Sequence, residues 1–344
     1  LYTMCGKKAT EVQEVCCGDI AAVSKLTDTR TNDSLCDPKH PVNLTAIPFP
    51  VANYTMAIAP KTKGQEDKVA NGLVRLSEED MTFHCVNNAE TRQMVLTGTG
   101  DIQLSVLCAK LKDRFGVEVT LSPARVPYRE KIRKKVKVEG KHKKQSGGHG
   151  QYGDVWIEFE PCDSEELVFA ENVFGGSVPK NFFPAVEKGL RDSVQHGVLA
   201  GYPVVYLKAT LVDGSYHPVD SSEMAFKTAA SLAYKAGLAQ ANPVLLEPIG
   251  ELHVIVPDSY TGDVMGDLNK RRGRVMGMNP VEAGEQEIVA EVPMGEMGTY
   301  AIDLRSMTQG RGMFTYAFLR YEDAPPAVQE KAIAEAKQMQ GDEE

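Results

Sequence analysis

The sequence lacks several features that mark common classes of protein. No apolar run approaches the roughly 20 residues that a membrane-spanning helix needs. The first residues, LYTMCGKKATEV, lack the charged start and apolar middle of a signal peptide. The motif G-x-x-x-x-G-K-[ST] occurs nowhere in the chain, which argues against a P-loop nucleotide site. We therefore expect a cytoplasmic protein with neither a membrane span nor a phosphate loop in these residues.

Cysteine usage argues against two further kinds of site. The chain has seven cysteines, and none of them forms the C-x-x-C pair typical of zinc sites and redox dithiols. An odd number of cysteines without regular spacing favours a reduced protein. We expect free, mostly buried thiols and no metal site.

Positive charge is in short supply overall. The 344 residues include 38 Lys and Arg against 47 Asp and Glu, which gives a net charge of −9. This balance argues against a general nucleic-acid coat, so any contact with phosphate must come from a local basic patch. With 42% hydrophobic residues, the chain is long enough for two to four domains with separate cores.

Two parts of the chain repeat the same order of elements. Residues 46–122 and 251–324 both follow the pattern βαββαβ. This is the order of a ferredoxin-like sandwich, in which helices cover one face of a sheet. Residues 1–45 alternate like strands of an incomplete barrel, and 123–250 form a further domain. The predicted fold class is multidomain α+β, with partial β-barrel strands and two ferredoxin-like sandwiches flanking an α+β domain.

Apolar side chains at helical spacing predict six helices in these domains and a seventh in the tail AVQEKAIAEAKQMQ. The six span Gln65–Ser77, Asp101–Phe115, Pro179–Gln195, Ser221–Ala241, Gly262–Lys270 and Thr299–Thr308. Asp220 and Glu223 are spaced as a capping box for the fourth of them. Pro243 and Pro248 are expected to mark a linker before the second sandwich.

A glycine-dense loop, SGGHGQYG, lies between a lysine-rich strand and the strand DVWIEFE. Its glycines formally satisfy G-x-G-x-x-G, but the dinucleotide fingerprint needs a preceding strand and a following helix, so a nucleotide site is disfavoured. A plain hairpin connection and a loop that approaches a large anionic surface remain open. For the second, lysine charges suit an RNA backbone. The candidate contacts are Gly147, Gly148, His149, Gly150, Gln151 and Tyr152, backed by Lys141, Lys143 and Lys144.

A second loop, DGSYHPVDSS, separates a strand from a helix. Asp213, His217 and Ser221 suggest a hydrolase triad, although a triad normally combines residues from separate elements. An exposed Tyr and His can instead stack on, or hydrogen-bond to, unpaired RNA bases. This interpretation makes Tyr216, His217 and Asp220 candidate contacts, and a surface loop with a capping Asp is the third alternative.

The second sandwich carries two basic edges, NKRRGRVMG and RSMTQGRGMF. Arginine side chains match phosphate geometry, and solvated turns are the alternative interpretation. The candidate phosphate contacts are Lys270, Arg271, Arg272, Arg274, Arg305 and Arg311. His84 and His253 lie within apolar strands and are expected to be core residues.

Six stretches in order resemble the C-terminal half of bacterial elongation factor G, the translocation GTPase: SGGHGQYGDVWIEFEP, GGSVPKNFFPAVEKGLRDSVQHGVLAGYPVV, DGSYHPVDSSEMAFKTAAS, PVLLEPI, GDVMGDLNKRRGRVMGM and DLRSMTQGRGMF. The resemblance implies the end of the β-barrel second domain at 1–45 and the third domain at 46–122. It implies the fourth domain, resembling a small-subunit ribosomal protein fold, at 123–250 with the helix of 325–344. The fifth domain would occupy 251–324.

The resemblance also implies partners and cofactors. The ribosome, with its RNA, tRNA and mRNA, would be the partner, and His217 would lie at the point of contact of the fourth domain. The fifth domain would approach the large subunit through its basic edges. GTP and Mg²⁺ would belong to a G domain upstream, so this chain alone would have no enzymatic activity. A ribosomal protection factor, a recycling paralogue and, with less support, an autonomous hydrolase remain alternatives.

Overall fold

The computed structural model describes residues 1–145, 150–281 and 284–343 of the chain. The chain divides into two compact units, one of 1–52, 59–86 and 96–120, and the other of 53–58, 87–95 and 121–344. Among the described residues, no helix combines the length and the hydropathy that crossing a membrane requires.

The first part of the chain contains a two-stranded ribbon and a four-stranded sandwich. Strands β1 (Tyr2–Cys5) and β2 (Lys8–Glu11) pair antiparallel and are exposed. The sandwich has the sheet order β4-β5-β3-β6, the arrangement of a ferredoxin-like fold. Each of its two helices, α1 and α2, has buried leucines three or four residues apart on one face, and this apolar face packs on the sheet. In chain order its elements are β3 (Tyr54–Pro60), α1 (Glu66–Glu79), β4 (His84–Asn88), β5 (Gln93–Gly98), α2 (Asp101–Phe115) and β6 (Val119–Pro123).

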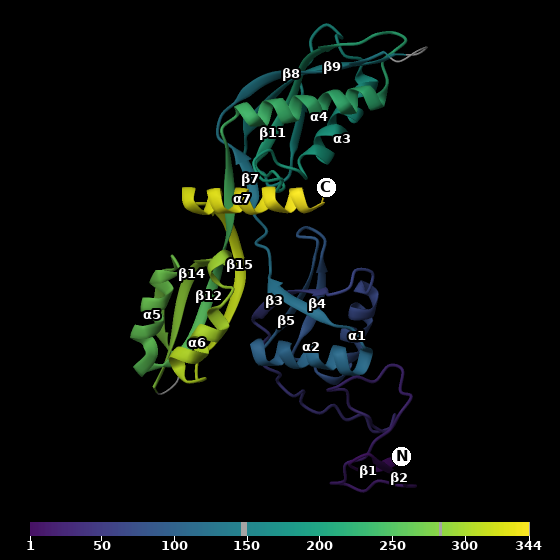
Figure 1. The fold of residues 1–344 in the computed structure, drawn as a ribbon, viewed down its shortest axis with the longest axis vertical. Helices are drawn as coiled ribbons and strands as arrows, with labels where there is room; N and C mark the ends of the chain where they lie inside the picture. The colour runs from purple at the N-terminus through teal and green to yellow at the C-terminus, as the bar shows by residue number, and fades with distance from the viewer. Residues whose placement is uncertain (146–149, 282–283, 344) are drawn as a thin grey trace. The chain divides into compact units, whose positions relative to one another are not determined.

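The middle part is an α+β layer structure with sheet order β10-β11-β9-β8. Helices α3 and α4 cover one face of this sheet (Figure 1), and the core between them includes Phe159, Phe226 and Tyr234. Strand β10 runs parallel to β11, and the other pairs are antiparallel. The elements are β7 (Arg129–Ile132), β8 (Val136–Lys144), β9 (Gln151–Pro161), β10 (Val168–Glu171), η1 (Lys180–Phe182), α3 (Phe183–Ser193), β11 (Leu207–Ser215) and α4 (Glu223–Gln240).

The second sandwich has sheet order β13-β14-β12-β15, with α5 and α6 on one face of its sheet (Figure 1). Its core joins Leu252, Val254 and Val256 of β12 to residues of both helices. The helix α7 (Pro326–Glu343) buries Ala332 in a small cluster with Leu245 and Ala324. The other elements are β12 (Pro243–Pro257), η2 (Asp258–Tyr260), α5 (Thr261–Lys270), β13 (Arg274–Pro280), β14 (Glu285–Pro293), η3 (Met294–Glu296), α6 (Tyr300–Thr308) and β15 (Met313–Asp323).

The predicted linker at Pro243 and Pro248 was wrong, because both prolines lie in the 15-residue strand β12. This strand pairs with β7 up to Leu246 and with β14 from Ile249 onward, while β15 pairs along its other edge. Pro248 thus falls where one edge of β12 has no partner strand. A missing N–H is tolerated at such a position.

Three smaller predictions were also wrong, the first of them about the thiols. They are not mostly buried: Cys5, Cys16, Cys17 and Cys36 are exposed, and Cys85, Cys108 and Cys162 are partly exposed. The first four meet solvent because residues 1–53 bury no side chain and so build no core of their own.

The cap of α4 and the two histidines also differ from expectation. The helix is capped by Ser222, whose side chain accepts a hydrogen bond from the Ala225 N–H. Asp220 lies two residues too early and has another role. His84 is exposed, and His253 lies on the open face of its sheet between Glu251 and Glu287, with ring-nitrogen to oxygen distances of 2.7 and 3.0 Å. Alternation in an antiparallel strand sends half of the side chains outward, whatever their apolar neighbours.

Candidate nucleic-acid interface

The two loops singled out in the sequence lie side by side and are tied together through Asp220. The Gly150 N–H donates to Asp220 Oδ1 at 3.0 Å, and the Tyr152 N–H donates to the Asp220 carbonyl at 2.8 Å. Ser221 Oγ donates to the Tyr152 carbonyl at 3.0 Å. These bonds join the start of β9 to the turn before α4, 68 to 70 residues further along the chain.

Close backbone approach explains the glycines at this end of the domain. A Cβ added to Gly150 would lie 3.0 Å from the Asp220 carboxylate, and one added to Gly153 would lie 2.5 Å from the Ala225 carbonyl oxygen. Glycine is the residue that lets backbone and helix meet at such distances. The glycines of G-x-G-x-x-G therefore serve strand-to-helix packing and loop-to-loop contact at the two described positions.

Polar side chains at the ends of β8, β9 and β11 are bonded to one another next to the two loops. The Tyr152 hydroxyl lies 2.6 Å from Ser215 Oγ, which donates to Asp154 Oδ2 at 2.6 Å. The Lys141 ammonium lies 3.5 Å from the same carboxylate. The charge of Asp154 raises the pKa of Lys141 above its usual range. Lys141 is thus partly committed to an internal partner, and Asp154 and Ser215 were missed by sequence reasoning because only the register of β8, β9 and β11 brings them together.

The outer side of the loops is open to solvent. Tyr216 is 47% exposed, and the side chain of His217 is 52% exposed. Gln151, Lys143 and Lys144 are exposed at the adjoining strand ends. We call these five residues the tip surface. Gly147, Gly148 and His149, also predicted as contacts, lie outside the described residues.

The geometry does not support the hydrolase alternative. The Ser221 hydroxyl proton is donated to the Tyr152 carbonyl, and Ser221 Oγ accepts from the backbone N–H of His217. The imidazole Nδ1 of His217 accepts from the backbone N–H groups of Val219 and Asp220. Asp213 Oδ1 accepts from the Gly214 N–H. A triad needs a base that takes the serine proton, and the imidazole is not bonded to this hydroxyl.

The arginines of the first basic edge are largely engaged with carboxylates of their own domain. Arg272 donates to both oxygens of the buried Glu247 at 2.8 and 2.9 Å, and to Glu296 at 3.1 Å. Arg271 is half-buried and pairs with Asp267 and Asp303. These two side chains hold the edge of the sandwich together and present little free charge.

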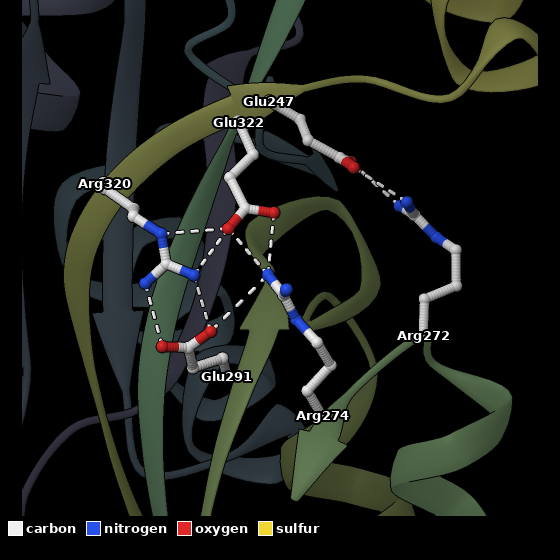
Figure 2. A network of polar contacts seen from close by, with 6 residues as sticks. All are labelled: Glu247, Arg272, Arg274, Glu291, Arg320 and Glu322. Atoms are coloured by element: carbon white, nitrogen blue, oxygen red, sulfur yellow. Dashed lines mark hydrogen bonds and ion pairs between the residues drawn. The ribbon is translucent and has the colours of Figure 1, made fainter. Parts of the chain in front are cut away.

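Arg274 belongs to a second network that sequence reasoning missed. Arg320 donates to both oxygens of Glu291 at 2.8 and 2.6 Å, and Arg274 donates to Glu322 at 2.6 Å. Figure 2 shows the two carboxylates held between the two guanidinium groups, with the Arg272–Glu247 pair beside them. The residues come from three different strands. Only sheet register could have revealed the network.

The other basic candidates of this domain are more accessible. Lys270 ends α5 and is exposed, as are Arg305 and Arg311. Arg311 bonds the Tyr260 hydroxyl and lies over its ring, with 4.8 Å from Cζ to the ring centroid. An arginine stacked on tyrosine keeps its charge and a free edge for a phosphate.

The network in Figure 2 gives a prediction for acid stability. Hydrogen bonds from Arg320 lower the pKa of Glu291. The carboxylate therefore stabilises the fold above its unfolded pKa of about 4.3, and this contribution is lost as pH falls through the lower folded value. Glu291→Gln should cost about 1–3 kcal/mol at neutral pH and less in acid. Urea unfolding at neutral pH and below pH about 4 measures the difference, with Glu285→Gln as the control. Equal losses at both pH values would contradict the assignment.

Comparison with known proteins agrees with this arrangement. Three family models match in succession: "Elongation Factor G, domain III" over residues 48–123, "Elongation factor G, domain IV" over 124–242 and "Elongation factor G C-terminus" over 244–332. A crystal structure of a protein from Thermus thermophilus is similar, with 38% identity and a TM-score of 0.84. The match covers 98% of this chain and 51% of that one. The present chain therefore spans about half the length of that protein.

Proposed function

Because the chain belongs to the elongation factor G family, we propose that it is the ribosome-binding arm of a factor that promotes GTP-dependent movement of tRNA and mRNA in the cytoplasm. The observation that carries the proposal is the tip surface. Two loops are tied together by one backbone hydrogen bond and two between side chain and backbone. Together with the end of β8, they present an aromatic ring, an imidazole and two lysines to solvent. Such a surface suits folded RNA, which offers phosphates, ribose hydroxyls and unpaired bases.

The proposed mechanism is mechanical and electrostatic. The tip surface would occupy space beside tRNA and mRNA and form hydrogen bonds to them, with no bond made or broken at these residues. A loop that is already ordered loses less conformational entropy on binding than a flexible one. The Asp220 bonds to Gly150 and Tyr152 would therefore favour binding of the tip surface to RNA. Lysines would position the arm on the RNA backbone without reading its sequence.

In the second sandwich, we assign the phosphate contacts to Lys270, Arg305 and Arg311. Arg271, Arg272 and Arg274 would shape that edge through their carboxylate partners. GTP and Mg²⁺ would be bound by a part of such a factor that the present residues do not span, since the chain has no phosphate-loop motif. That G domain would also be a partner of this chain.

Two related functions would use the same surface. A ribosomal protection factor would displace a drug from the ribosome, and a recycling factor would help to separate its subunits. Resistance conferred by the complete gene would identify the first, and subunit splitting without tRNA movement the second.

Salt dependence tests the RNA contact of the tip surface. The logarithm of the binding constant falls linearly with the logarithm of the salt concentration, and each lysine that neutralises a phosphate makes this fall steeper by about one unit. The double variant Lys143→Gln and Lys144→Gln should bind ribosomes more weakly at about 50 mM salt. The magnitude of its salt slope should be smaller than that of the parent by about two units. Ribosome co-sedimentation across a salt series measures the slope. Lys208→Gln, whose ammonium already pairs with Glu160 at 2.8 Å, is the matched control. An unchanged slope in the double variant would rule out phosphate contact by these lysines.

A further inference from the structure

A cavity of about 770 Å³ lies apart from the tip surface and from the basic edges of the second sandwich. Its walls come from the turn between β4 and β5, the segment that leads into β7, the loop between α3 and β11, and α7. All of the lining residues belong to the second compact unit of the chain. Cavities of roughly 300–1,000 Å³ are typical of sites for small organic molecules. The volume therefore suits such a ligand better than a single inorganic ion.

The cavity is positively charged, although the chain as a whole is acidic. Three arginines line it against one carboxylate, Glu90, which leaves a formal excess of two positive charges in a chain whose net charge is −9. Arg129 pairs with this carboxylate: its Nη2 donates to Oε2 at 3.0 Å, and its Nη1 donates to the other oxygen. The excess is therefore supplied by Arg92 and Arg125. A concave surface with an excess of one sign of charge attracts ligands of the opposite sign.

Arg125 is the side chain best placed to bind an anion. It is exposed, and its Nη1 donates to the Thr91 carbonyl at 3.1 Å. Its backbone N–H donates to Gln93 Oε1 at 2.9 Å. These bonds hold the residue at the wall of the cavity, and its Nε and Nη2 have no hydrogen-bond partner among the residues that the structure describes. This pair of N–H donors matches the spacing of two oxygens of a phosphate or carboxylate.

The loop between α3 and β11, which forms one wall, is shaped by a buried carboxylate behind it. Glu130 is 1% exposed, and its two oxygens accept from the backbone N–H groups of Leu199 and Ala200, each at 2.9 Å. The oxygen bonded to Ala200 also accepts from the Tyr202 N–H at 3.3 Å. A Cβ added to Gly197 would lie 2.2 Å from this carboxylate and would displace it. The wall thus has its shape without a ligand, as in most small-molecule sites.

Apolar groups complete the lining, among them the side chains of Pro127, Tyr202 and Pro203. We propose that the cavity binds a small organic anion, with a phosphate or carboxylate group at Arg125 and a ring-sized apolar body against the proline and tyrosine side chains. An inorganic phosphate would bind the charge but leave most of the cavity empty. The site contains no residue of the tip surface, so the proposal goes beyond the function of the arm and does not depend on contact with RNA.

Calorimetric titration of the 344-residue chain with adenosine 5′-monophosphate, and separately with 2-naphthoate, tests the proposal. The two probes carry a phosphate and a carboxylate on a ring-sized body, so their comparison shows which group the cavity prefers. At least one of them should bind saturably at one site per chain, with a Kd below about 1 mM. The matched neutral molecules, adenosine and 2-naphthamide, should bind at least about tenfold more weakly. No saturable binding of either anion up to about 5 mM, or equal binding of anion and neutral counterpart, would overturn the proposal.

Variants of the lining locate the binding site. Arg125→Gln should weaken binding of the anionic probe about 10- to 100-fold, the effect of losing hydrogen bonds to a charged group. Arg114→Gln is the matched control, because this exposed arginine pairs with Glu79 and does not line the cavity. Ala200→Phe should abolish binding, since it fills the cavity without changing its charge. Thermal unfolding shows whether each variant folds, and parent-like binding by folded Arg125→Gln would refute the anion site.

Ribosome binding distinguishes a small ligand from RNA as the occupant of the cavity. The salt slope of ribosome binding by Arg125→Gln should equal that of the parent, because the cavity is separate from the tip surface. A smaller slope in this variant, together with no binding of either probe, would assign the cavity to an RNA phosphate and reject the small organic anion. Failure of the tip-surface lysine experiment would leave the calorimetric result unaffected.

Discussion

His217→Ala in the full-length factor should slow translocation about 10- to 100-fold while leaving ribosome-stimulated GTP hydrolysis unchanged. The range corresponds to one lost hydrogen bond to a charged or partly charged acceptor, about 1.5–3 kcal/mol. The GTPase rate should not change because the side chain acts at the tip surface, apart from any phosphate loop. Rapid-kinetic measurement of tRNA movement, beside phosphate release under the same conditions, gives both rates.

The control for this experiment is His84→Ala. His84 is also exposed, but it lies in β4 of the first sandwich and outside the tip surface. Its loss should change neither rate. Parallel loss of translocation and GTP hydrolysis in His217→Ala would indicate weakened ribosome binding or folding, and would remove the mechanical role proposed for this residue. An unchanged translocation rate would do the same.

Gly140→Val should destabilise the middle domain by about 3 kcal/mol or more. A Cβ at this position would lie 2.2 Å from the Ala229 carbonyl oxygen and 2.6 Å from the Ala233 backbone nitrogen. These are backbone atoms of α4, so the helix itself would have to move away from β8. Overpacking of this kind costs typically 1–3 kcal/mol, and more where the backbone cannot relax. The transition in urea or on heating should shift accordingly.

Gly266→Ala is the matched control for the glycine experiment. Gly266 lies within α5, and an added Cβ would meet nothing within 4 Å. Alanine is favoured over glycine in a helix by about 1 kcal/mol, so this variant should be more stable than the parent. A Gly140→Val protein with parent-like stability would show that α4 does not pack on β8 as described. The tip surface depends on that packing, since α4 starts at the tip loop.

Secondary structure was largely predictable because it depends on local periodicity. The helix predicted at Asp101–Phe115 has the same bounds in the structure, and its buried leucines are the ones at helical spacing. The predicted helix at Gln65–Ser77 is α1, shifted by one or two residues at its ends. The ferredoxin-like order of both sandwiches followed from the same signal. Apolar spacing is written into short segments, so no long-range contact is needed to recognise it.

Prolines, histidines and caps were predicted less well because their roles depend on partners. Pro248 looks like a chain break in sequence, yet it is tolerated where β12 has one free edge. His253 alternates among apolar residues, but its face of the sheet is open to solvent and carries two carboxylates. Asp220 was expected to cap α4, but its carboxylate instead accepts a hydrogen bond from the Gly150 N–H of the neighbouring loop.

By itself, the sequence determined the order of elements, the two sandwiches, the family and the segments that carry the tip residues. Tertiary structure alone decided how those residues work together. It brought Asp220 to Gly150 and placed the His217 imidazole against the backbone of its own turn. It also paired three of the predicted arginines with carboxylates from other strands and helices of the domain. The reason is physical: periodicity and motif are properties of neighbours along the chain, whereas hydrogen-bond partners and ion pairs are set by strand register and helix packing between residues far apart in sequence.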